Sequence, residues 1–243
     1  MQRQDDMQDL FNPNLKAELE AWLQGRFAGL CAATGQPGPS SGLRISPALA
    51  EWETLYFVRG LEENFFAIDE QGGVTSDLLE SSDDNEAPPT RYRLFSNPPP
   101  RLLRENVCQL AIAARLILER GWLKEHVVLQ LSRGEHRGTA ESFDLLVRLR
   151  ADEILILVEV KRSRLELEKL ITDLRACSRR GPHAHEECGF PQNHPRHEFC
   201  VSKRPAYLWT VAPDGEICFA VKCDQESLDL QPLNSLPPRS LLE

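Results

Sequence analysis

The sequence predicts an α/β protein whose central mixed sheet is built from residue 101 onward. Apolar residues recur there first at helical spacing and then in short strand-like runs. The predicted order is one helix, three strands, a second helix, and one or two further strands. A small α+β region precedes this core, so we predict domains at 1–96 and 97–243.

The first core helix is predicted over residues 101–120, and Gly121 follows it as a C-terminal signal. Its repeat consists of Leu103, Val107, Ala111, Ala114 and Leu118. The three strands are predicted at 126–132, 142–150 and 154–162.

The chain after these strands reads as a helix over Leu165–Cys177 and a final hairpin. The hairpin joins AYLWTVA to EICFAVKC through the turn residues Pro213, Asp214 and Gly215.

The N-terminal region gives weaker signals. We expect a helix near Leu15–Leu30 with Asn14 as its N-cap, and strands in TLYFVRG and NFFAIDEQGGVTS. An acidic linker, SSDDNEAPPT, then leads into RYRLF. Nothing in this region suggests chemistry, so a role in binding a protein partner or in specificity is the expectation.

The net charge of −9 is unevenly distributed. Residues 1–90 carry −11, residues 91–243 carry +2, and residues 161–180 carry +4. This basic stretch predicts phosphate contacts, with a solvated helix face as the alternative. The candidate nucleic-acid-binding residues are Lys169, Arg175, Arg179 and Arg180.

Seven cysteines, with no secretory signal or apolar run of membrane-spanning length, predict a cytoplasmic protein with reduced thiols and no membrane contact.

The chemistry is predicted in the hairpin of residues 142–150 and 154–162. A tight turn between Ala151 and Asp152 pairs residues whose numbers sum to 303, which sets Asp144 opposite Glu159. Lys161 lies two residues further, on the same face. Two adjacent carboxylates repel each other and lose solvation beside apolar strands, and Mg²⁺ or Mn²⁺ would remove both costs.

Phe143-Asp144 and Glu159-Val160-Lys161, on the second and third strands of this core, resemble the PD-(D/E)XK nuclease superfamily over residues 101–222. The resemblance implies a restriction-endonuclease-like core in which Asp144 and Glu159 bind the metal and Lys161 is catalytic. The backbone carbonyl of Val160 would be a further metal ligand. Phe143 stands where the family name has proline.

Some members of the family add a glutamate from the first helix. Glu105 is the candidate here, with stabilisation of a helix N-terminus as the alternative.

A second cluster lies in residues 177–200, which are rich in cysteine, histidine, proline and glycine. Thiolate and imidazole ligands suit a tetrahedral Zn²⁺. We predict Cys177, Cys188 and Cys200 as ligands, with His194 or His197 as the fourth. The alternative is a loop whose histidines face solvent or phosphates.

The sequence therefore predicts a metal-dependent nuclease acting on nucleic acid, with DNA as the expected substrate, in defence, recombination or repair, and a homodimer is one expected assembly. The alternatives are a catalytically silent binding module with the same fold and a zinc-organised protein-interaction adaptor.

Overall fold

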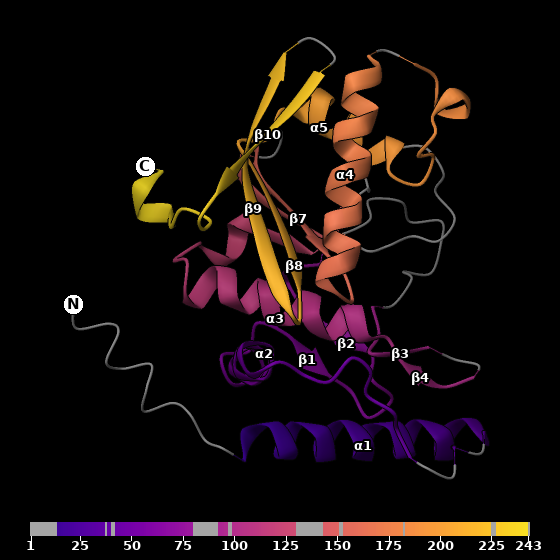
Figure 1. Ribbon diagram of the computed structural model, residues 1–243. Coiled ribbons are helices and arrows are strands. Elements are labelled where there is room, and N and C mark those ends of the chain that lie inside the picture. Colours follow the sequence, from indigo (N-terminus) through magenta and orange to yellow (C-terminus); the bar gives the residue numbers. More distant parts are fainter. Residues whose placement is uncertain are drawn as a thin grey trace, which may run out of the picture.

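The computed structural model has an α/β fold built on a six-stranded mixed sheet (Figure 1). It describes residues 14–36, 38–39, 42–79, 92–96, 99–129, 143–150, 153–181, 183–224 and 227–242. Among these residues, no helix is long and apolar enough to cross a membrane.

The strands of the sheet lie in the order β10-β9-β8-β7-β6-β5, and only the β7–β8 pair is parallel. Their bounds are β5 Val127–Leu129, β6 Leu145–Arg150, β7 Glu153–Val160, β8 Tyr207–Ala212, β9 Gly215–Asp224 and β10 Ser227–Leu233. The predicted mixed sheet is confirmed. β10 was not predicted, and it extends the expected final hairpin to three strands.

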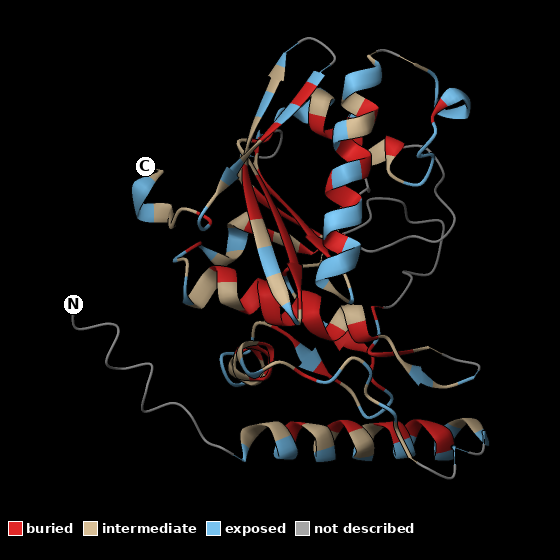
Figure 2. Ribbon diagram, in the orientation of Figure 1, coloured by how far each residue is buried: buried red, intermediate tan, exposed pale blue. Residues whose placement is uncertain are grey.

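Alternation along β7 divides the apolar core between the two faces of the sheet. Ile156, Val158 and Val160 pack with helix α3 (Arg104–Leu118), whereas Leu157 packs with α4 (Arg164–Arg180). Figure 1 shows α4 running along the sheet, with α3 between the sheet and the N-terminal elements. The central strands β7 and β8 are buried along most of their length, and α4 is exposed on its outer side (Figure 2).

The chain passes from β7 to the parallel strand β8 through α4 and a second helix, α5 (His194–Lys203). Ser163 caps α4 by accepting a hydrogen bond from the backbone N–H of Glu166 at 3.4 Å, and Gly181 (φ 74°) ends it. The proline and glycine content of residues 177–200 indicated an irregular loop and no helix was predicted there, so α5 is a correction. Pro195 in its first turn is compatible with a helix start.

The N-terminal region contains helices α1 (Leu15–Thr34) and α2 (Glu51–Glu62). The strand predicted for TLYFVRG is wrong because these residues belong to α2. Their β-branched and aromatic side chains are typical of a strand, but the buried positions Glu53, Phe57 and Gly60 recur at helical spacing.

Two short hairpins complete this region. β1 (Ala67–Ile68) pairs with β2 (Val74–Thr75), within the stretch predicted as strand. β3 (Phe95–Ser96) pairs with β4 (Arg101–Leu102), so the core helix begins three residues later than predicted.

The apolar core is continuous across residue 97, where the sequence predicted a domain boundary. Buried residues of α1, α2, α3 and the sheet form one cluster. A buried ion pair between Glu53 of α2 and Arg104 of α3 joins the two regions, and Arg104 also donates to the carbonyl of Pro47 at 2.9 Å. The N-terminal helices are therefore part of the same folded unit as the sheet.

The N-terminal segment also covers the edge of the sheet at β5. The backbone N–H of Leu129 donates to the carbonyl of Leu78 at 2.6 Å, and Leu79 forms a parallel bridge with Leu129. The opposite edge strand, β10, contains Pro232.

Candidate active site and metal centre

The register of the β6–β7 hairpin is the one that the sequence predicted at the site. Leu145 pairs with Val158, and the two following pairs continue the same register. Asp144 directly precedes β6, and its N–H donates to the carbonyl of Val158 at 3.0 Å. A register shift near Arg148 lies towards the turn and leaves the site end in register.

Asp144 is held from both α3 and β7. One carboxylate oxygen (Oδ1) accepts from Gln109 Nε2 at 2.7 Å, and the other (Oδ2) accepts from the backbone N–H of Val160 at 2.6 Å. Tyr92 in turn donates to Gln109 Oε1. Burial, and then the nearby Glu159 carboxylate, raise the pKa of Asp144 to about 8.

Glu159 is completely buried at the end of β7. Its Oε1 atom contacts Lys161 Nζ and lies 2.8 Å from a guanidinium nitrogen of Arg196 on α5. Its Oε2 atom is also buried and has no hydrogen-bond partner among the described residues. An unpartnered carboxylate oxygen is costly inside a protein, so this atom is suited to a ligand or a cation.

The two cationic side chains of the site reach towards solvent. The side chains of Lys161 and Arg196 are 22% and 24% exposed, whereas that of Glu159 is not exposed. An anionic group could therefore approach Lys161 and Arg196 from outside while the carboxylates remain in the interior.

Glu105, the candidate additional metal ligand, lies 3.3 Å from Arg162 in an ion pair (Oε1 to Nε). Within the described residues, no hydrogen bond joins the Glu105 carboxylate to Asp144 or Glu159. Gln109, one turn further along α3, instead contacts Asp144.

The predicted phosphate-binding residues of α4 differ in their contacts. Lys169 pairs with Asp173 at 3.1 Å. Arg175 donates to the carbonyl of Leu230 and lies over the ring of Phe219, so it supports the packing of α4 on the sheet. Arg179 and Arg180 are exposed in the last turn of α4.

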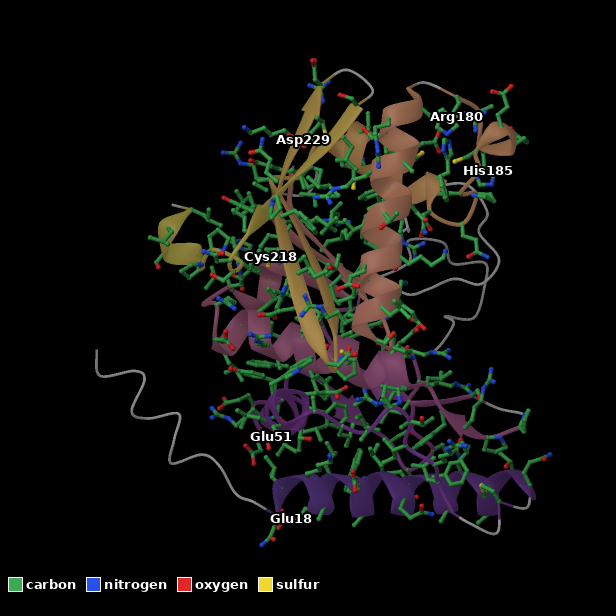
Figure 3. The ribbon with its side chains drawn as sticks, viewed as in Figure 1. Glu18, Glu51, Arg180, His185, Cys218 and Asp229 are labelled. Carbon is green, nitrogen blue, oxygen red and sulfur yellow. The ribbon has the colours of Figure 1, made fainter. Side chains whose placement is uncertain are left out.

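A Cys/His cluster of Cys177, His183, Cys188 and His194 lies at that end of α4. Each residue offers a ligand atom, and the four atoms lie within 4.8 Å of one another, so the cluster could hold a metal such as zinc. In Figure 3, the labels of Arg180 and His185 mark this part of the molecule.

The predicted ligand set is corrected at one position. Cys200 lies in the apolar core between α5 and the sheet and is not part of the cluster. His183 occupies the fourth position. His194 belongs to the cluster, whereas His197 lies outside it.

The electrostatic surroundings of the two thiols differ. Burial raises the pKa of Cys177 to about 12. Burial also opposes ionisation of Cys188, but hydrogen bonds from His183 and from the Phe190 N–H lower the pKa of Cys188 overall.

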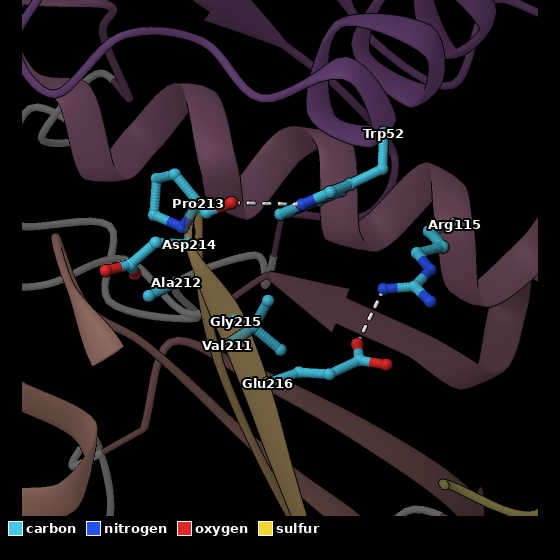
Figure 4. Close-up of a pocket in the computed structure, with 8 residues that line it drawn as sticks. All are labelled: Trp52, Arg115, Val211, Ala212, Pro213, Asp214, Gly215 and Glu216. Atoms are coloured by element: carbon cyan, nitrogen blue, oxygen red, sulfur yellow. Dashed lines mark hydrogen bonds and ion pairs between the residues drawn. The ribbon is translucent and has the colours of Figure 1, made fainter. Parts of the chain in front are cut away.

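A separate pocket lies between α2, α3 and the β8–β9 turn (Figure 4). The indole N–H of Trp52 donates to the carbonyl of Pro213 at 3.4 Å, and Arg115 pairs with Glu216 at 2.7 Å. Arg115 also pairs with Glu119, so its charge is already balanced. These contacts join the N-terminal region to the sheet.

A scan against protein-family models found no match, and searches of curated proteins and of solved structures found none.

Sequence reasoning missed Gln109, Arg196 and His183. Gln109 follows Glu105 at a spacing of four, so the helical repeat alone places it on the same side of α3. Arg196 was missed because α5 was not predicted. His183 was passed over because nothing in the loop sequence separates it from its neighbour His185.

Proposed function

We propose that this protein is a metal-dependent nuclease of the PD-(D/E)XK type, with Asp144, Glu159 and Lys161 as its active site. The observation that carries the proposal is the buried, unpartnered Oε2 atom of Glu159 at the end of the β6–β7 hairpin. Asp144 directly precedes the paired strand β6, and burial together with the nearby Glu159 carboxylate raises the pKa of Asp144.

The donor set fits a hard divalent cation. Two carboxylates and the backbone carbonyl of Val160 would offer oxygen ligands of the kind that Mg²⁺ and Mn²⁺ prefer. Such an ion, when bound, would supply an activated water and neutralise charge on the scissile phosphate. Glu105 remains a candidate outer ligand if its ion pair with Arg162 opens.

The chain's own residues would position and stabilise the reacting groups. Lys161 and Arg196 would contact phosphate oxygens, because both cations adjoin Glu159 and both reach solvent. Gln109 and the Val160 N–H would hold the Asp144 carboxylate in place.

The proposed substrate is nucleic acid, with DNA as the first choice. The exposed cations of α4 support a backbone contact, since phosphates supply most of the non-specific affinity for DNA. Defence, recombination and repair are the proposed settings.

The test is cleavage of plasmid, linear, single-stranded and branched DNA, and of RNA, in Mg²⁺ and in Mn²⁺. Asp144→Asn, Glu159→Gln and Lys161→Ala are each expected to reduce the rate by about 10²-fold or more. Glu153→Gln is the matched control, because Glu153 is the exposed residue at the other end of β7.

Loss of activity must be separated from loss of folding. Each variant is therefore compared with the wild type by thermal melting. Wild-type protein that cleaves none of these substrates would refute the nuclease, and binding without cleavage would favour the silent binding module. A Glu159→Gln variant with the wild-type rate would refute the site. Zinc content without any nucleic-acid binding would favour the adaptor.

A further inference from the structure

We propose that Cys177, His183, Cys188 and His194 bind one structural Zn²⁺ that fastens α5 and the preceding loop to the end of α4. This centre is separate from the proposed nuclease site and does not depend on nuclease activity. Its ligands come from the last turn of α4, the connecting loop and the first residue of α5.

The spacing of the ligand atoms matches a zinc tetrahedron. Tetrahedral Zn²⁺ with ordinary bond lengths separates two sulfurs by about 3.8 Å, and a sulfur from an imidazole nitrogen by about 3.6 Å. The sulfurs of Cys177 and Cys188 are 3.8 Å apart. Cys177 Sγ lies 3.5 Å from His183 Nε2 and 3.3 Å from His194 Nδ1.

Neighbouring groups contact the ligand side chains on the side away from the proposed metal, as is usual around protein metal sites. His183 Nδ1 lies 2.6 Å from the carbonyl of Gly181, so a proton on Nδ1 leaves Nε2 free to bind metal. The Phe190 N–H donates to Cys188 Sγ at 3.3 Å, which favours its thiolate. A Glu198 carboxylate oxygen lies 3.3 Å from His194 Nε2, the ring nitrogen not turned to Cys177, at ion-pair distance but without a hydrogen bond.

Four protein ligands leave no open position, so the ion would stabilise the fold and would not catalyse. Binding would release the two thiol protons to solvent. A Cys177–Cys188 disulfide is the competing state, but the sulfurs are too far apart to be bonded here, and all seven cysteines are free.

The metal would hold the helix that carries Arg196. His194 opens α5, and a second contact, from Asn193 Nδ2 to Asp173 Oδ2 at 2.8 Å, ties the same turn to α4. Two residues beyond His194, Arg196 reaches the buried Glu159. Zinc would therefore fix the distance between α5 and the end of β7.

The experiment is metal analysis of the full chain purified under reducing conditions without added metal, followed by replacement with Co²⁺. About one zinc per chain is expected, and Co²⁺ should give the strong visible absorption of a tetrahedral site with thiolate ligands. Chelation should lower Tm by more than about 5 °C, and Zn²⁺ but not Mg²⁺ should restore it.

Histidine variants separate this site from its alternatives. His183→Ala should lose zinc, whereas His185→Ala should retain it, although His185 also lies against the His194 ring. Cys188→Ser should lose zinc and Cys200→Ser should retain it. Both histidines are outside the apolar core, so their variants should fold. Less than about 0.2 zinc per chain, a Cys177–Cys188 disulfide in the purified protein, or zinc retained in His183→Ala would overturn the proposal.

Discussion

The carboxylate of Asp144 accepts a hydrogen bond from the backbone N–H of Val160 at 2.6 Å, across the strand pair that also carries Glu159. The contact links the residue before β6 to the last residue of β7. The position of Asp144 is therefore coupled to the geometry of the sheet and, through Gln109, to α3.

Gln109→Ala should slow cleavage in a protein that still folds. The substitution removes one of the two hydrogen bonds to the Asp144 carboxylate and leaves the Tyr92 hydroxyl with only its longer contact, to the carbonyl of Asn106 at 3.4 Å. We expect a stability loss of about 1–3 kcal/mol and a rate loss of about 10-fold or more. Tyr92→Phe is the control, because it removes the hydrogen bond from Tyr92 to Gln109 and keeps the hydrogen bond from Gln109 to Asp144. Equal rates in Gln109→Ala and wild type would exclude a positioning role.

Neutralising Arg179 and Arg180 should make DNA binding less dependent on salt. Each lost phosphate contact should reduce the log–log slope by about 0.9 for duplex DNA. Binding is measured by fluorescence anisotropy at several salt concentrations. Lys16→Gln on α1 is the control, and Arg175 is left intact because it supports the fold. If the slope is unchanged in the double variant, Arg179 and Arg180 do not contact DNA, and the binding surface lies elsewhere on the protein.

Glu53→Gln should destabilise the whole protein and not only its N-terminal part. The substitution leaves the buried Arg104 without its counter-charge, which typically costs about 3–5 kcal/mol. The exposed pair Arg59–Glu63 is the control, and Glu63→Gln should cost less than about 1 kcal/mol. Denaturant unfolding should show one transition for both variants. Two transitions in Glu53→Gln would restore the predicted boundary near residue 97.

Gly60→Ala should be destabilising although Gly60 lies inside a helix. A Cβ atom there would lie 2.5 Å from Phe66 and 3.1 Å from Ala114 of α3, so we expect a cost of about 1–3 kcal/mol. Gly25→Ala in α1 has open space around it and should instead stabilise by about 0.5–1 kcal/mol. Thermal melting of the two variants gives the comparison, and a stable Gly60→Ala would contradict the close α2–α3 packing.

Removal of zinc should slow nucleic-acid cleavage, because the zinc site would hold the helix that positions Arg196. If the ion fixes α5, then Cys188→Ser and Arg196→Ala should each slow the reaction, and the double variant should be little slower than Arg196→Ala. This outcome requires both proposals to hold. Additive losses would keep the zinc site but separate it from the active site.

The parts of the fold that could be predicted are those fixed by residues close together in the sequence, such as turns and apolar repeats. The β6–β7 register followed from a short turn and two apolar strands, so the proximity of Asp144 and Glu159 could be predicted from the sequence. Helix α2 could not be predicted, because Tyr56 and Phe57 are compatible with a helix or a strand. Packing against α3 decides between the two. Cys200 lies in the core because α5 packs against the sheet. The spacing of the cysteines in the sequence does not predict that packing.

The contact between Leu129 and Leu78–Leu79 bears on how the chain avoids self-association. An uncovered edge strand offers its backbone groups to a strand of another molecule, and β5 is apolar. Pro232, which has no N–H to donate, interrupts such pairing at the opposite edge. A chain lacking the segment that contains Leu78 and Leu79 would therefore expose the unpaired backbone groups of β5. We expect such a chain to form insoluble aggregates during expression.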